Sequence, residues 1–155
     1  MITVINLPNE WATAALARRV AAAARAGDVI ALSGELGVGK TTFARAFLHA
    51  RHADADEVPS PTFTLVQIYP APDGAIWHFD LYRLTATVDA WELGIEDAFA
   101  SGISLIEWPE RLGPLLPAHR LEIRLEFGDR PDARRAAIDG NSDWCVRLKP
   151  ALADV

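Results

Sequence analysis

The sequence predicts an α/β fold with one domain over residues 1–155, in which a mixed parallel and antiparallel sheet is flanked by helices. Half of the 155 residues are hydrophobic, which is sufficient for a single globular core. Short apolar runs of strand length alternate with helical patterns through most of the chain, as in α/β proteins. The last part of the chain shows a period of two, which predicts antiparallel strands at one end of the sheet.

The first third of the chain predicts two strands and two helices. Residues 2–6 are a short strand candidate. Residues 8–27 open with Pro-Asn-Glu, a helix start, and continue as an alanine-rich run closed by glycine. Residues 28–33 are apolar without a helical period, as expected for a strand buried on both faces of a parallel sheet. A glycine-rich loop follows, and apolar residues on one helical face predict a helix over 40–51.

The middle of the chain predicts a hairpin, short helices and a buried strand. Residues 62–69 and 75–81 are rich in β-forming residues and are separated by Pro-Ala-Pro-Asp-Gly, so they predict an antiparallel hairpin. Residues 88–100 predict one or two helical pieces broken near Gly94. Residues 103–107 predict a second buried strand.

The C-terminal part predicts a small antiparallel end to the sheet. Residues 121–127 alternate between apolar and polar side chains, and shorter runs follow at 134–138 and 144–148. Strict alternation of this kind is typical of half-buried strands.

The composition favours a cytoplasmic protein. Cys145 is the only cysteine, so no internal disulfide is expected, and Cys and His do not show the spacing of metal ligands. Charged residues interrupt the alanine-rich N-terminal run, which argues against a signal peptide or membrane span. The net charge of −6 is the opposite of a nucleic-acid-binding footprint, so a role near RNA is expected to run through a partner.

Residues 34–41 read Gly-Glu-Leu-Gly-Val-Gly-Lys-Thr, which matches the phosphate-loop pattern G-x-x-x-x-G-K-[ST] between a strand and a helix. Glycines let backbone N–H groups approach phosphates, and the positive end of the following helix attracts the anion. Lys40 can reach the β and γ oxygens, and the Thr41 hydroxyl can ligate Mg²⁺. The predicted nucleotide-binding residues are Gly34, Glu35, Leu36, Gly37, Val38, Gly39, Lys40 and Thr41.

Two acids are candidates for holding Mg²⁺ and for orienting an attacking water. Asp80 and Glu107 each end a largely apolar strand, so both are expected at the carboxyl edge of the sheet, where α/β proteins bind ligands. The alternative is that each acid satisfies a local turn. Trp108 is expected either to cover the site or to pack in the core.

Three further residues near these strands have two readings. Thr62 and Thr64 lie in Ser-Pro-Thr-Phe-Thr, which either senses the γ-phosphate as a switch or reflects the β propensity of threonine. His78 is interpreted as a hairpin residue and not as a catalyst.

Five segments occur in the order and spacing of the bacterial TsaE (YjeE) family, which the chain resembles over about residues 8–127. The segments are GELGVGKTTFARAF, SPTFTLVQIY, HFDLYRL, LGIEDAF and SLIEWPERL. The phosphate loop is common to many families, whereas SPTFTLV followed by HFDLYRL and then IEWPERL is highly specific to this one.

The resemblance implies an ATPase that uses ATP and Mg²⁺ and works with the TsaB and TsaD proteins in threonylcarbamoyl modification of tRNA, which it meets indirectly through that complex. It implies a motor or reset role, not the transfer itself. It also implies that Thr42 joins the loop residues, that Thr41, Asp80 and Glu107 hold the metal, and that Asp80 resembles a Walker B acid. Glu107 and Lys40 are then catalytic, and Trp108 lies near the γ-phosphate; Thr64 is a weaker match.

Three other functions remain compatible with a phosphate loop. A small-molecule kinase uses the same loop, although its arginine-bearing lid has no obvious counterpart in Arg111, Arg130, Arg134 and Arg135. A GTP-dependent switch is disfavoured because no Asn-Lys-x-Asp stretch is present. A scaffold with a structural nucleotide would bind ATP without hydrolysing it.

Overall fold

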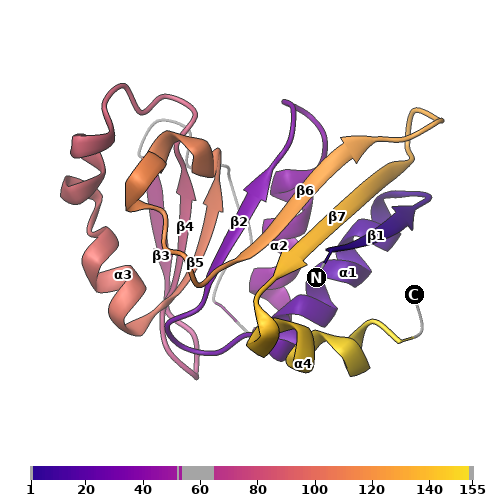
Figure 1. Ribbon diagram of the computed structural model, residues 1–155, viewed down its shortest axis with the longest axis horizontal. Helices are drawn as coiled ribbons and strands as arrows, with labels where there is room; N and C mark the ends of the chain where they lie inside the picture. The colour runs from indigo at the N-terminus through magenta and orange to yellow at the C-terminus, as the bar shows by residue number, and fades with distance from the viewer. Residues whose placement is uncertain (1, 52, 54–64, 154–155) are drawn as a thin grey trace.

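The computed structural model describes residues 2–51, 53 and 65–153, and its described strands form one seven-stranded sheet (Figure 1). The strand order is β1-β7-β6-β2-β5-β4-β3. The strands are β1 (Ile2–Leu7), β2 (Val29–Ser33), β3 (Val66–Tyr69), β4 (Ile76–Asp80), β5 (Ile103–Glu107), β6 (Leu121–Phe127) and β7 (Arg134–Gly140). The helices are α1 (Glu10–Ala23), α2 (Lys40–Ala50), α3 (Ile95–Ser101) and α4 (Ser142–Ala151), with 3-10 helices η1 (Thr87–Leu93) and η2 (Pro109–Leu115).

The centre of the sheet is parallel and both of its sides are antiparallel, so the predicted mixed sheet is confirmed. Strand β2 runs parallel to β5 and β6, and β4 runs parallel to β5. Strand β3 pairs antiparallel with β4, and β7 pairs antiparallel with both β6 and β1. Because β2, β4 and β5 run in the same direction, the segments that follow them meet at one edge of the sheet.

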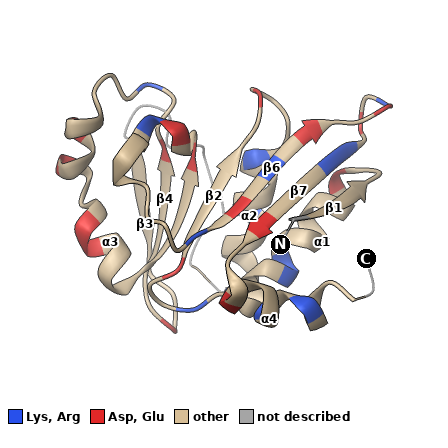
Figure 2. Ribbon diagram, viewed as in Figure 1, with Lys and Arg blue, Asp and Glu red and all other residues tan. Residues whose placement is uncertain are grey.

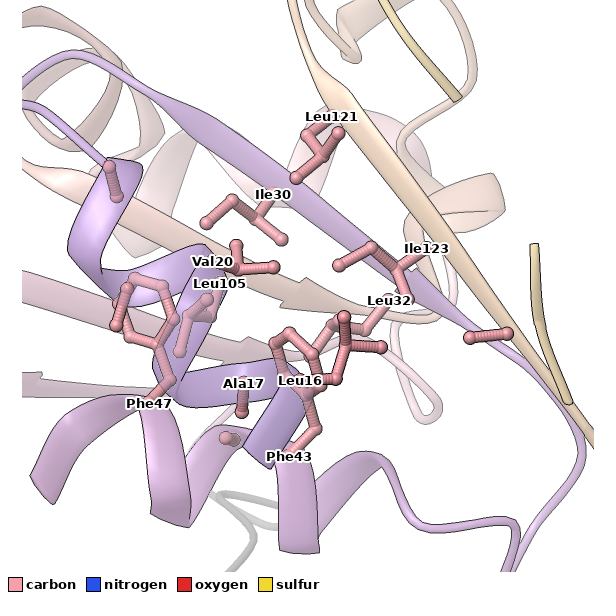
Figure 3. Close-up of a cluster of buried hydrophobic side chains, with 14 of the residues drawn as sticks. Leu16, Ala17, Val20, Ile30, Leu32, Phe43, Phe47, Leu105, Leu121 and Ile123 are labelled. Atoms are coloured by element: carbon pink, nitrogen blue, oxygen red, sulfur yellow. The ribbon is translucent and has the colours of Figure 1, made fainter. Parts of the chain in front are cut away.

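Helices α1 and α2 cover one face of the sheet and form the larger core with it (Figure 3). The spacing of their apolar residues by three and four places the buried side chains on one helical face. The labelled members of this cluster are Leu16, Ala17, Val20, Ile30, Leu32, Phe43, Phe47, Leu105, Leu121 and Ile123. A second cluster includes Phe79 of β4 and Ile106 of β5. Other residues of the same two strands, Ile76 and Leu105, belong to the first cluster. Because successive side chains of a strand point to opposite faces, both faces of the central strands are buried against a hydrophobic cluster.

Most predicted elements are present, with small shifts at their ends. Asn9 is the N-cap of α1, and its side chain accepts a hydrogen bond from the backbone N–H of Ala12 at 3.0 Å. The helix ends at Ala23, earlier than the predicted end near residue 27. The β3–β4 hairpin and the break at Gly94, where φ is 83°, are confirmed. Residues 62–64 of the predicted hairpin lie outside the described residues.

The predicted strand at 144–148 is wrong, because these residues lie in helix α4. The side chain of Asn141 caps this helix by accepting a hydrogen bond from the N–H of Trp144 at 3.0 Å. Trp144 and Leu148 are buried four residues apart, which is the spacing of a helix face and not of a strand. No helix among the described residues is long and apolar enough to span a bilayer.

Candidate nucleotide-binding site

The phosphate loop joins the carboxyl end of β2 to the first turn of α2, as the sequence predicts. Glycine is required at two of its positions for different reasons. Gly39 precedes the helix with φ of 117°, a conformation that L side chains rarely adopt. Gly34 has φ of 141°, and a Cβ there would lie 2.5 Å from the carbonyl oxygen of Leu125. The loop can therefore approach β6 closely only without a side chain at position 34.

A hollow of about 370 Å³ opens beside the loop and brings together residues from three strand ends. Pockets of this size are in the range that holds small ligands. Ten residues line it: Leu36, Gly37, Gly39, Lys40, Thr41, Thr42, Asp80, Tyr82, Glu107 and Trp108. Nine of them are predicted site residues, so the structure places these in one location.

Three predicted loop residues lie outside the lining of this hollow, and one lining residue is new. Gly34 and Glu35 instead line a separate hollow together with the end of β6, and the Val38 side chain is buried. Tyr82 was missed, although it follows the predicted acid Asp80 by only two residues. Its ring lies 4.9 Å from that of Trp108, centroid to centroid.

Lys40 is folded back toward the loop and is only 5% exposed. Its Nζ donates hydrogen bonds to the backbone oxygens of Gly34 and Glu35, the second at 3.4 Å. The same Nζ lies 3.9 Å from the centroid of the Trp108 ring, a cation–π contact. Trp108 itself has φ of 58°, so the chain turns sharply after β5 and brings the ring over the lysine.

Burial lowers the pKa of the Lys40 amine from its ordinary value, because desolvation disfavours the charged form. The negative charges of Glu107, Asp80 and Glu110 oppose this shift and raise the pKa. The site thus holds a partly desolvated cation facing acidic groups.

Asp80 and Glu107 lie side by side as register partners at the ends of β4 and β5. They are 5% and 2% exposed. The Oδ1 atom of Asp80 accepts a hydrogen bond from the N–H of Tyr82 at 3.1 Å. The Oε2 atom of Glu107 lies 2.6 Å from Nε2 of His78. Both carboxylates are therefore held by partners and both line the hollow.

The oxygen groups of the site fit a magnesium ion that is bound chiefly by its nucleotide. The described residues hold no cluster of three or more His, Cys, Asp or Glu side chains that would bind a metal alone. The hollow does contain the Thr41 hydroxyl and two carboxylates. Mg²⁺ is usually held by one or two such groups together with substrate phosphates.

A second hollow of about 310 Å³ lies on the other side of the loop and was not predicted. It shares Gly37, Gly39 and Thr42 with the first hollow. The rest of its lining comes from the loop, the start of α1, the β6–β7 connection and the first residue of β7: Val38, Glu10, Thr13, Pro131, Asp132 and Arg134. Arg134 is fixed there by a hydrogen bond from its Nε to the carbonyl oxygen of Val38 at 2.8 Å.

Thr62 and Thr64 lie outside the described residues, so their predicted switch role stays a prediction.

Figure 2 shows Lys and Arg segments interspersed with Asp and Glu segments over the described ribbon.

Comparisons with known proteins give one consistent result. The family model described as threonylcarbamoyl adenosine biosynthesis protein TsaE matches residues 7–136. A protein from Rickettsia bellii named tRNA threonylcarbamoyladenosine biosynthesis protein TsaE is 38% identical over 82% of this chain and 87% of its own. The protein of that name from Streptomyces coelicolor is 38% identical over 89% of this chain and 97% of its own.

A solved structure shares the fold. The crystal structure of Bacillus subtilis YdiB superimposes with a TM-score of 0.78 and 28% identity, covering 97% of this chain and 95% of that one. The match of the family model over most of the chain, together with these relatives, shows that the chain belongs to the TsaE family of threonylcarbamoyl adenosine biosynthesis proteins.

Proposed function

We propose that the protein binds Mg-ATP at the phosphate loop and hydrolyses it in support of tRNA threonylcarbamoyladenosine biosynthesis, together with TsaB and TsaD proteins. One observation carries the proposal. Lys40, Asp80 and Glu107 come from three separate elements and line a single hollow beside a complete phosphate loop. A phosphate loop needs such acids to hold the metal and to orient the nucleophile.

Each residue has a distinct task in this mechanism. The loop amides and the start of α2 hold the phosphates, and Lys40 exchanges its contacts with loop carbonyls for the β and γ oxygens. Thr41 and Asp80 would hold Mg²⁺, and the bound cation would neutralise charge on the phosphates. Glu107 orients a water molecule in line with the bond between the γ-phosphorus and the bridging oxygen. Trp108 shields the cluster from bulk water.

The two hollows support one orientation of the nucleotide. They share three loop residues, so a ligand that wraps around the loop enters both. The first hollow has the acids and the lysine and takes the β and γ phosphates. The second hollow, between α1 and the β6–β7 connection, then takes the nucleoside.

The link to tRNA is indirect in this proposal. The net charge of −6 opposes direct binding to a phosphate backbone, which requires a surplus of Lys and Arg. Partner proteins that themselves bind tRNA would therefore bring the ATPase to its place of action.

The test measures orthophosphate release from ATP by the wild type and two variants, with and without TsaB and TsaD from the same organism. Lys40→Ala should abolish turnover and tRNA modification. Glu107→Ala should retain ATP binding in calorimetry and lose hydrolysis. Normal turnover by Lys40→Ala would contradict the ATPase assignment, and normal turnover by Glu107→Ala would contradict the water-orienting role. A phosphorylated small molecule in place of orthophosphate would identify a kinase.

A further inference from the structure

A buried histidine is bonded to the acid that the proposed mechanism uses to orient water. His78 in β4 is fully buried at 0% exposure. Its Nε2 atom lies 2.6 Å from Oε2 of Glu107, which is itself buried in β5. The register partner of His78 is Leu105, two residues before Glu107. The two side chains therefore lie on the same sheet face and meet diagonally across the parallel pair.

We propose that His78 is a positioning residue, which fixes Glu107 in the orientation that the attacking water requires; this inference rests on the proposed function. An ionised carboxylate only accepts hydrogen bonds, so Nε2 carries the proton and donates it to Oε2. With Oε2 occupied, the other oxygen of Glu107 is the one that remains for water. The bond thus selects both the rotamer of Glu107 and the oxygen that acts.

The surroundings of His78 support a role through Glu107. The Nδ1 atom is buried and has no hydrogen-bond partner among the residues that the structure describes. Buried polar atoms are usually paired, so the unpaired Nδ1 atom lowers stability. An apolar side chain would fill the same space in the core without that cost. The one side-chain hydrogen bond described for His78 is to the acid at the site.

His78 does not itself touch the ligand in this arrangement. It is not among the residues that line either hollow. Strands β4 and β5 are already paired along five register positions, from Ile76 with Ile103 to Asp80 with Glu107. The histidine is therefore not needed to join the two strands, and its effect on catalysis must pass through the carboxylate.

Side-chain length provides the test. The amide nitrogen of glutamine reaches about as far as Nε2 of histidine, whereas that of asparagine stops near the position of Nδ1. We expect His78→Gln to keep most of kcat. His78→Asn should lower kcat on the order of a hundredfold, the cost of a small misplacement of a catalytic group. The dissociation constant for Mg-ATP should change less than about twofold in both variants, since ground-state binding is not affected.

A double variant separates positioning from general damage to the core. If His78 acts only through Glu107, then adding His78→Asn to Glu107→Ala should lower kcat no further than Glu107→Ala alone. Thermal melting of each variant checks folding. If His78→Asn does not fold, the comparison of His78→Gln with His78→Met, a buried side chain of similar length without a donor, replaces it.

Three outcomes would overturn the inference while leaving the ATPase assignment intact. These are a normal kcat in His78→Asn, an equal loss in His78→Gln, and multiplicative losses in the double variant. Failure of the proposed function looks different, because the wild type would then release phosphate no faster than Lys40→Ala. That result would remove the inference as well.

Discussion

The carbonyl oxygen of Leu125 occupies the space where a side chain at position 34 would begin. A Cβ there would lie 2.5 Å from that oxygen and 2.8 Å from Cγ1 of Val38. Gly37 in the same loop has φ of 79°, and a Cβ at that position would have no atom within 4 Å among the described residues. The two glycines share a backbone constraint, and only Gly34 also has a steric one.

Gly34→Ala should therefore lower the free energy of unfolding more than Gly37→Ala. At Gly37 the substitution costs about 1–2 kcal/mol of backbone strain. At Gly34 the clash adds about 1–3 kcal/mol, and it displaces the loop from β6. Urea unfolding of the two variants measures this cost in stability. Equal effects of the two substitutions would show that the contact with Leu125 does not shape the loop.

Lys40 should make nucleotide binding sensitive to alkaline pH. Burial lowers the pKa of its amine in the free protein, and only the protonated amine attracts phosphate. Affinity is thus fully present below this lowered pKa and falls as the pH rises through it, at a lower pH than for an exposed lysine. Calorimetry as a function of pH measures the fall. Lys40→Arg is the matched control, since its guanidinium stays charged and whatever affinity it retains should be independent of pH over that range.

At the scale of the elements, one arginine of helix α4 contacts both the end of α1 and Asp28, which precedes β2. The guanidinium of Arg147 forms two hydrogen bonds with Asp28, at 2.7 and 3.1 Å, and one with the carbonyl oxygen of Ala23 at 2.7 Å. Ala23 is the last residue of α1, where helical carbonyls lack intrahelical partners. The Arg147 side chain is 7% exposed and lies 3.9 Å from the Trp144 ring.

Arg147→Met should lower the free energy of unfolding by about 3 kcal/mol, because it leaves the half-buried Asp28 without its cation. Arg124→Ala is the control: the Arg124–Glu126 pair has side chains 63% and 45% exposed, and its loss should cost less than about 1 kcal/mol. Denaturant unfolding measures both. Because α4 lies away from the phosphate loop, Arg147→Met should not change the affinity for Mg-ATP, and a loss of affinity would indicate coupling between α4 and the site.

Sequence patterns identified the two buried strands correctly, but they did not identify helix α4. Residues 28–33 and 103–107 are largely apolar, and a buried strand was the correct interpretation because both faces of β2 and β5 are covered. The run at 144–148 is too short for its period to decide between strand and helix. Two contacts favour the helix: the local cap from Asn141 and the tertiary contact of Arg147 with the distant Asp28.

Some residues of the candidate site were likewise predictable from the sequence, and others were not. The loop residues were predictable because they form a contiguous sequence motif. The two strand-end acids were predictable because the carboxyl ends of parallel strands meet at one edge of the sheet. Tyr82 and the pairing of His78 with Glu107 were not, because they depend on the register between β4 and β5. The second hollow was also missed, since it joins the start of α1 to the β6–β7 connection.

At the scale of the whole molecule, one sheet joins two hydrophobic clusters, and the phosphate loop leaves the sheet at its centre. Strand β2, which leads into the loop, contributes Ile30 and Leu32 to one cluster and Val29 to the other. A ligand bound at the loop therefore contacts an element on which both clusters depend. We expect the domain to unfold as one cooperative unit and to respond to the nucleotide as a whole.

Mg-ATP, or an analogue that is not hydrolysed, should raise the melting temperature of the whole domain in a single transition. At a ligand concentration one hundred times the dissociation constant, binding adds about 2.7 kcal/mol, which for a chain of this size corresponds to roughly 5–10 °C. Differential scanning calorimetry measures the shift, and Lys40→Ala should remove it. Two separate transitions, with only one moved by the nucleotide, would mean that the clusters unfold independently and that β2 does not couple them.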